Sequence, residues 1–325
     1  MRRLAASSKP SSLVMAVAFH HCSLAPLQSL NATAPSGYVI GVIGEAGSGI
    51  ETLLQLAAGV ETPQFGSVEA SAPVQFCGPW DPVTSWRAGS LALFHTLDLK
   101  DALTRAQAAI ELEKLRRAGG TALLASHDLE LILWLADEVW WLDGGRLAAK
   151  GDPKETVQAY RHHIARRLSE LGRGANIALT PTLRKGDGRA SLEIVELRNS
   201  AGDMTSVLCT GETVCVRVVV RFAAEVAAPV VGILIRTRIG FEVFGTNTEL
   251  ENVSLGPCRA GERVEVVFRF PCHLCPQEYT LTVASHDPDG VWHDWMEEGL
   301  AFSVTDYRYT AGVACLRTQV TACKL

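Results

Sequence analysis

The apolar residues change their spacing near residue 170, and this change constrains the fold more than any other feature of the chain. Before it, short apolar runs alternate with helical stretches. After residue 188, apolar residues recur at every second position between turns rich in Gly, Pro and Asp. Strands that alternate with helices indicate a parallel α/β sheet, whereas successive period-two strands indicate an antiparallel β-sandwich. The sequence therefore predicts an α/β domain followed by an all-β domain.

The expected elements give the limits of these domains. In the first half we expect strands at 38–43, 91–94, 121–125 and 139–142, and helices at 51–58, 102–117, 129–136 and 153–171. In the second half we expect strands at 191–197, 212–222, 230–238, 263–270, 279–285 and 300–304. We therefore place domains at residues 1–170 and 188–306. Residues 171–187, rich in Gly, Arg and Lys, are a predicted linker, and residues 307–325 a tail.

The start of the chain has two interpretations. Arg2, Arg3 and Lys9 precede the apolar run Leu13–Phe19, which is faintly similar to a secretory signal. The run is short and ends in His20 and His21, so we favour a first β-strand.

Composition excludes several classes of protein. In 325 residues, 30 Lys and Arg stand against 35 Asp and Glu, and 47% of residues are hydrophobic. This balance disfavours a disordered chain and a basic nucleic-acid binder. No apolar run reaches the roughly 18–20 residues of a membrane span. The nine cysteines are odd in number and scattered, which is typical of reduced thiols in a cytoplasmic setting. The lone Cys272-His-Leu-Cys275 lacks a second pair, so we expect a plain loop and no metal.

A glycine-rich segment lies between a predicted strand and a predicted helix. Gly44-Glu-Ala-Gly-Ser-Gly49 has the context of a phosphate-binding loop, in which backbone N–H groups at a helix start face an anion. A Walker A motif continues with Lys and Ser or Thr, but here Ile50 and Glu51 follow, and then Thr52. A carboxylate about 4 Å from a phosphate costs roughly 1–4 kcal/mol. The same glycines also suit a simple tight turn.

Further motifs give the first half a family resemblance. Leu53-Leu-Gln-Leu-Ala-Ala-Gly59, Thr121-Ala-Leu-Leu-Ala-Ser-His-Asp128 and Asp137-Glu-Val-Trp-Trp-Leu-Asp-Gly-Gly-Arg146 resemble segments of ABC-transporter ATPases. The resemblance implies ATP and Mg²⁺ as cofactors and His127 as the residual catalytic histidine, the family's switch histidine. It also implies a nucleotide-binding set of Gly44, Gly47, Ser48, Gly49 and Thr52.

The first half departs from that family where charge is needed. The strand Leu91-Ala-Leu-Phe ends in His95 and Thr96, where the family has the Asp-Glu pair that organises magnesium and activates water. No Ser-Gly-Gly signature lies between Val74 and Ala92, and the helical subdomain has too few residues. Trp140 and Trp141 lie in an apolar strand and are predicted packing residues. We therefore expect ATP hydrolysis to be lost.

The second half resembles a more specific family. Pro229-Val-Val-Gly232, Gly240-Phe-Glu-Val-Phe-Gly-Thr-Asn-Thr248, Tyr279-Thr-Leu-Thr-Val-Ala-Ser-His286 and His293-Asp-Trp295 are similar to the C-terminal domain of Wzt-type ATPases of O-antigen exporters. That resemblance implies an immunoglobulin-like sandwich that recognises polysaccharide. It implies a bacterial protein located in the cytoplasm at the inner face of the plasma membrane. The implied partners are a polysaccharide, a transmembrane exporter subunit, and an intact ATPase subunit or a second copy bound through the sandwich, with no nucleic acid.

A polar and aromatic cluster in the sandwich is the candidate carbohydrate site. It consists of Asn247, Thr248, His286, His293, Asp294 and Trp295, and Trp292 lies in the same turn-rich segment. Aromatic faces stack on sugars, and a few placed polar groups fix a ligand's orientation. The alternative is that Trp295 packs in the core while His293 and Asp294 bond a turn.

Three functions follow from these observations. The first is a Wzt-like exporter subunit that binds glycan and has lost ATP hydrolysis. The second is an active exporter ATPase with atypical motifs, and the third is a non-catalytic scaffold or oligomerisation subunit.

Overall fold

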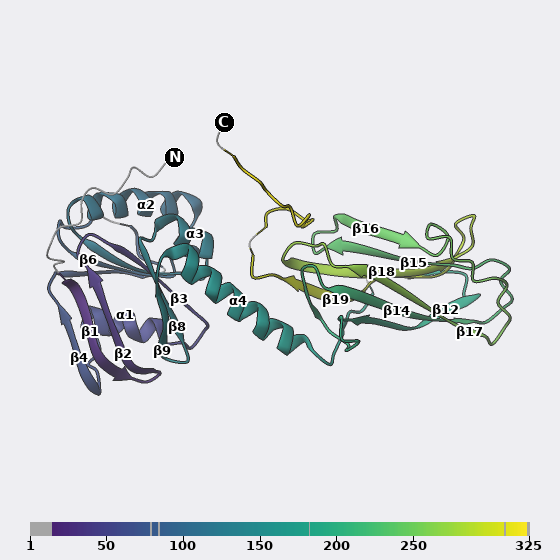
Figure 1. Cartoon of the computed structure of the whole chain (residues 1–325), viewed down its shortest axis with the longest axis horizontal. Coiled ribbons are helices and arrows are strands. Elements are labelled where there is room, and N and C mark those ends of the chain that lie inside the picture. Colours follow the sequence, from purple (N-terminus) through teal and green to yellow (C-terminus); the bar gives the residue numbers. More distant parts are fainter. Residues whose placement is uncertain (1–14, 79, 84, 182, 309, 324–325) are drawn as a thin grey trace. The chain divides into compact units, whose positions relative to one another are not determined.

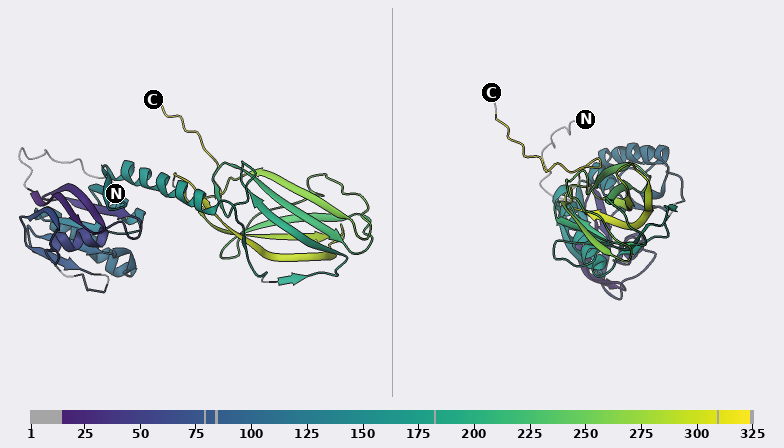
Figure 2. Two further views of the ribbon diagram at one scale, coloured as in Figure 1. Left: turned by 90° about the horizontal axis from the view of Figure 1, so that it is seen from below. Right: turned by 90° about the vertical axis from the view of Figure 1, so that its right-hand side faces the viewer.

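The computed structural model describes residues 15–78, 80–83, 85–181, 183–308 and 310–323, shown in Figure 1 and from two further directions in Figure 2. The chain forms two compact units, Met1–Tyr160 and Arg161–Leu325, which we describe separately. Arg2, Arg3 and Lys9, on which the comparison with a secretory signal rested, lie outside the described residues. None of the helices described is both long and apolar enough to span a membrane.

A six-stranded sheet forms the centre of the first unit, in the order β5-β6-β7-β3-β8-β9. Its members are β3 (Val39–Gly44), β5 (Val74–Cys77), β6 (Leu91–His95), β7 (Thr121–Ala125), β8 (Glu138–Asp143) and β9 (Arg146–Gly151). All neighbours pair in parallel except β9, which runs antiparallel to β8. The parallel strands β3 and β7 are fully buried, which is typical of strands covered on both faces.

Helices and a second sheet cover this sheet's two faces. Helix α1 (Ile50–Ala58) shares one hydrophobic core with the antiparallel sheet of β1 (Met15–Leu24), β2 (Leu27–Pro35) and β4 (Phe65–Ala70). Helices α2 (Ala102–Arg117) and α3 (Leu129–Leu135) pack in a second core on the other face (Figure 1). A 3-10 turn spans Leu97–Leu99. The described residues between Cys77 and Leu91 form no helix, so no helical subdomain separates β5 from β6.

Two sheets enclose one core in the second unit (Figure 2). One consists of β12 (Ala190–Arg198), β14 (Thr213–Phe222) and β17 (Arg263–Pro271). The other contains β10 (Ile177–Ala178), β11 (Leu183–Lys185), β13 (Val207–Cys209), β15 (Val230–Thr237), β16 (Glu242–Asn247), β18 (Gln277–His286) and β19 (Trp292–Thr305). An α/β unit followed by an all-β unit is the order that the sequence predicts. The immunoglobulin-like connectivity stays a prediction.

The predicted linker differs from the structure. Residues 177–178 and 183–185 form β10 and β11, and both strands pair with β19 of the second unit. These strands are exposed and too short to show an apolar period, so their pairing is visible only in three dimensions. The division between the units falls after Tyr160, inside α4 (Pro153–Gly172), whereas the sequence placed it at residue 170. Part of the predicted tail also packs on the unit, because Ala314 bridges to Leu274.

We expect the two cores to melt separately. Leu281 and Leu123 are each fully buried, in the second and first unit respectively. Replacing either by Ala should cost about 2–5 kcal/mol of unfolding free energy in its own unit. In scanning calorimetry of the full chain, Leu281→Ala should shift one transition and Leu123→Ala the other. A single transition that both substitutions shift equally would contradict this expectation.

Candidate functional site

Packing contacts hold the glycine-rich loop of the first unit in shape. The loop leaves β3 and ends at Gly49, the residue that precedes α1, with Gly47 and Gly49 at φ of +80° and +97°. A side chain on Gly44 would bring its Cβ to 2.4 Å from the Ser48 hydroxyl, and one on Gly49 would come to 2.5 Å from Leu27. These positions therefore require glycine for steric reasons alone.

A cavity of about 250 Å³ opens where three parallel strands end. The glycine loop follows β3, His95 and Thr96 end β6, and His127 follows β7, so all reach the same edge of the sheet. Of the nucleotide-binding set that the resemblance implies, Gly47, Ser48, Gly49 and Thr52 line this cavity together with His127, while Gly44 lies outside the lining.

The lining combines features that favour an anion with features that oppose one. The hydroxyl of Ser48 is buried and makes no hydrogen bond, which leaves a donor for a ligand. The carboxylates of Glu45 and Glu51 line the same cavity, and the apolar Ile50 stands in the lysine position. Repulsion between Glu51 and a phosphate opposes the attraction of the helix start. These residues do not fit Mg²⁺-bound ATP.

Neither nearby acid replaces the missing Asp-Glu pair. Asp98 accepts a hydrogen bond from the Ser126 hydroxyl at 2.8 Å, and Asp101 caps α2 by accepting one from the Thr104 amide at 2.9 Å. Both carboxylates thus have structural partners. Thr96 holds a left-handed backbone conformation, with φ of 56°, which is uncommon for a residue other than glycine.

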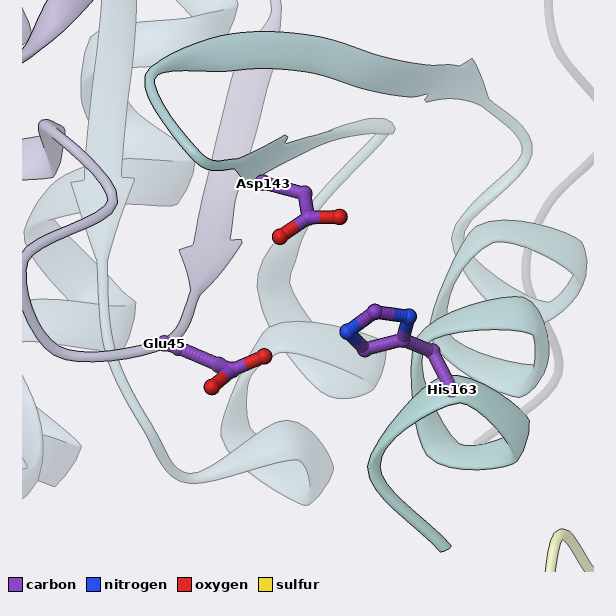
Figure 3. Close-up of side chains that lie close together, drawn as sticks. All are labelled: Glu45, Asp143 and His163. Carbon is purple, nitrogen blue, oxygen red and sulfur yellow. The ribbon is translucent and has the colours of Figure 1, made fainter. Parts of the chain in front are cut away.

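Two carboxylates near the ends of β3 and β8 affect a tyrosine of the same unit. Glu45 follows β3 and Asp143 ends β8, as Figure 3 shows; His163, the third residue drawn, belongs to the second unit. Burial, followed by the negative charges of Glu45 and Asp143, raises the pKa of the Tyr160 phenol. Its ring packs edge-on to Trp141 at 5.7 Å between ring centres. Tyr160 is therefore a neutral packing residue.

A hollow of about 220 Å³, which we call the aromatic hollow, lies on the outer face of the larger sheet in the second unit. Its lining comes from four strands and includes His286, Trp292 and Trp295. Small residues form the floor: Gly232 of β15, Gly245 of β16 and Ala284 of β18. The two tryptophan rings meet edge to face with centres 4.5 Å apart. The arrangement offers apolar walls and few polar groups, as small-ligand sites do.

Strand alternation decides which predicted residues reach this hollow. Along β18, Tyr279, Leu281 and Val283 enter the core. Thr282, Ala284 and His286 therefore face outward and line the hollow. Asn247 pairs with Gly232, and Trp295 pairs with Ala284, so both also face outward. Asn247, His286 and Trp295 are thus brought together.

The other three predicted residues lie elsewhere. Thr248 is buried, accepts a hydrogen bond from the Val231 amide at 3.1 Å, and lines a neighbouring depression. Asp294 is buried opposite Ser285 and paired with Arg184 at 2.7 Å. His293, with a fully buried side chain, lies 3.1 Å from the Ser285 hydroxyl. Thr248 and Asp294 alternate with the outward Asn247 and Trp295, and His293 is the residue left over at the irregular step between β18 and β19. None of the three lines the hollow.

His293 belongs to a series of polar side chains that pair with one another within the second unit. Its Nε2 lies 3.1 Å from Asp287, and Asp287 pairs with Arg189 at 2.6 Å. Ser285, His293 and Asp287 are the residue types of a hydrolytic triad. Ser285 is completely buried, so no substrate reaches its hydroxyl.

Two polar groups in the aromatic hollow have defined roles. The Asn247 side-chain oxygen accepts a hydrogen bond from the Leu250 amide at 2.7 Å, which leaves its NH₂ group to donate to a ligand. His286 Nδ1 lies 2.6 Å from the Asp287 carbonyl oxygen, so Nδ1 carries the proton and donates. Nε2 of His286 is then left to accept from a ligand hydroxyl.

Sequence reasoning missed part of the lining. Thr282 and Gly232 belong to it but are not in the predicted set. Both were available from the period-two pattern, since each is flanked by core residues on its strand. Trp292, which the sequence groups with the cluster but which is not in the predicted set, pairs with His286 across an irregular step in the ladder and lines the hollow.

The Cys272-His-Leu-Cys275 motif is a loop between β17 and β18. Both thiols are free and buried. Burial raises the pKa of Cys272 to about 11 and raises the pKa of Cys275. Thiols with raised pKa values are poor nucleophiles and poor metal ligands at neutral pH.

Comparisons with known proteins bear on both units. Residues 181–316 match the family model described as the Wzt C-terminal domain. The expected Wzt-type resemblance is confirmed. The O-antigen export system ATP-binding protein RfbB of Myxococcus xanthus is 23% identical over 225 residues, covering 50% of this chain and 50% of that protein. The chain thus spans about half the length of the curated relative it matches.

Solved structures similar to the chain include a Wzt C-terminal domain and a part of an ABC transporter complex. The crystal structure of the C-terminal domain of wzt has 22% identity and a TM-score of 0.43, covering 46% of this chain and 93% of that one. The structure of cbiO1 from Clostridium perfringens, part of the ABC transporter complex cbiONQ, has 13% identity and a TM-score of 0.38, with coverages of 47% and 94%.

The buried cysteines of the second unit should resist alkylation. At pH 8, iodoacetamide should modify the exposed Cys323 first and leave Cys272 and Cys275 unmodified while the protein is folded. Mass spectrometry of the peptides measures this order, and denatured protein, in which all thiols react, is the control. EDTA should leave the rates unchanged, because we expect no metal on these thiols. Faster labelling of Cys272 after EDTA would reveal a metal site.

Proposed function

We propose that this chain is the glycan-recognition subunit of a polysaccharide exporter and binds the sugar in its aromatic hollow. The observation that carries this proposal is the joint placement of Trp292, Trp295, His286 and Asn247 around a hollow with a floor of small residues. Indole faces pack against the C–H surfaces of a sugar ring, while hydroxyls need donors and acceptors at the edge. Asn247 supplies the donor and His286 the acceptor.

The proposal assigns no ATP hydrolysis to the first unit. Phosphoryl transfer depends on positioned positive charge, a metal ion and an oriented water. Ile50, Glu51, His95 and Thr96 supply none of these at the four positions concerned. The glycine loop would then keep its shape for packing, as the contacts of Gly44 and Gly49 support.

The exporter setting of this proposal rests on the Wzt-type relatives. RfbB is named as an ATP-binding protein of an O-antigen export system. By analogy we place this chain in the bacterial cytoplasm, at the inner face of the plasma membrane, beside a transmembrane exporter subunit. An intact ATPase subunit would supply the hydrolysis. Self-association through the sandwich is the alternative assembly, because β16 ends its sheet and offers unpaired backbone groups.

Replacing Trp295 tests the glycan site. Trp295 is half-buried on the outer face, so Trp295→Ala should leave the fold intact and weaken glycan binding at least about tenfold, equal to about 1.4 kcal/mol. A glycan array with the full chain identifies the ligand, calorimetry measures the affinity, and circular dichroism checks the fold. Trp80→Ala is the matched control, because Trp80 is 87% exposed in the first unit. A folded protein that binds no glycan would favour the scaffold function.

A second experiment tests the loss of hydrolysis. The purified chain should release no phosphate from ATP above background with Mg²⁺ present. Ile50→Lys combined with Glu51→Thr should strengthen binding of a fluorescent ATP analogue, because it removes the repelling carboxylate and adds a cation. It should not restore hydrolysis, since His95 and Thr96 remain. Phosphate release by the unaltered chain that disappears in His127→Ala would establish an active ATPase instead.

A further inference from the structure

A short strand from the predicted linker lies beside Trp295, which lines the aromatic hollow, and we call this side its border. Strand β11 pairs with β19, so that Arg184 lies opposite Met296 and Lys185 opposite Trp295. The Arg184 guanidinium binds the buried Asp294 carboxylate through two hydrogen bonds, of 3.0 and 2.7 Å. A two-point contact of this kind fixes geometry as well as adding energy. It holds β11 against the edge of the sheet.

Alternation along β11 places the next side chain on the outer face. Arg184 points inward to Asp294, and Lys185 lies over the Trp295 ring with its ammonium 5.6 Å from the ring centre. Lys185 is exposed, and within the described residues no carboxylate pairs with it. An ammonium on an aromatic face is weakly held when exposed, so it remains available to a ligand.

The described residues that line the hollow include no carboxylate. Its ionisable side chain is His286, and the Lys185 ammonium lies over Trp295, one of its lining residues. The Asn247 oxygen accepts from the Leu250 amide, and the Thr246 hydroxyl donates to Glu251, so the Asn247 NH₂ group and the Lys185 ammonium are left to donate to a ligand. A neutral sugar, whose hydroxyls both donate and accept, does not need a cation at the border. An anionic substituent does.

We propose that the hollow selects a sugar that carries a carboxylate, as uronic acids do. This inference rests on the proposed glycan binding and names its ligand class. The sugar ring packs on Trp292 and Trp295, and its carboxylate binds the Lys185 ammonium at the border. Asp294 and Arg184 are positioning residues: they act by holding β11.

Matched ligands test the charge by itself. Oligosaccharides from pectin, alginate and hyaluronan are each compared with their carboxyl-reduced forms, which keep the same sugar backbone and lose the negative charge. Binding to the full chain is measured by calorimetry, and a panel of neutral glycans is included. We expect the acidic form to bind about tenfold more tightly than its reduced partner, and added NaCl to diminish the difference.

Matched variants assign the effect to one residue. Lys185→Met keeps the aliphatic stem over Trp295 and removes the charge, so it should abolish the preference for the acidic form and leave neutral binding unchanged. Lys185→Arg should retain the preference. Equal binding of acidic and reduced forms, or a preference that survives Lys185→Met, would overturn this inference while leaving glycan binding in place. Absence of binding to any glycan would overturn the proposed function as well.

Discussion

Alternation of side chains along β18 is the constraint on which the second unit depends. The strand pairs with β15 on one side and β19 on the other, so its register is fixed twice. Leu281 and Val283 fill the core, while Thr282 and Ala284 line the aromatic hollow. A shift of the β18 register by one residue would expose Leu281 and Val283. Burying each such side chain stabilises the fold by about 1.5–3 kcal/mol. The hydrogen bonds that hold the core therefore also position the hollow.

In the first unit, steric contacts hold the glycine-rich loop in shape, and Glu45 and Glu51 lie beside it. Gly44 is confined by Ser48 and by the Leu142 carbonyl oxygen, and Gly49 by Leu27. These contacts exist whether or not a nucleotide binds. A glycine pattern consequently indicates a turn, and only the charged residues around it indicate phosphate chemistry. Ile50 and Glu51 do not supply the positive charge of a phosphate site, although the cavity at the strand ends remains.

The order of the elements was predictable because apolar period is a local property. The apolar pattern of the sequence predicted the buried strands β3, β6 and β7 and the helices α1 and α2. Strands with exposed or mixed faces, such as β4, β9 and β11, were missed because they carry no apolar period of their own. Their pairing energy comes from neighbours distant in sequence, as Arg184 and Asp294 illustrate.

The candidate site was half predictable for the same reason. His293, Asp294 and Trp295 were grouped because they are adjacent in sequence, yet alternation places Asp294 and Trp295 on opposite faces, and the extra residue in the ladder leaves His293 buried beside Asp294. Applying that alternation would have separated Asn247 from Thr248 without a structure. It would not have placed Trp292 on the same face as Trp295, because the register shifts between Ser285 and His286 and one residue of β19 is left over.

The inward and outward polar residues of the second unit differ in what their replacement would cost. Asp294 and His293 are buried, so each requires a partner, and loss of Arg184 or Ser285 would leave a polar group unsatisfied. Replacing Asp294 or His293 would therefore destabilise the second unit. Asn247, His286 and Lys185 are only partly buried or exposed, and substitution there removes few internal contacts. The chemistry of the hollow can therefore change at its border without disturbing the registers that create it.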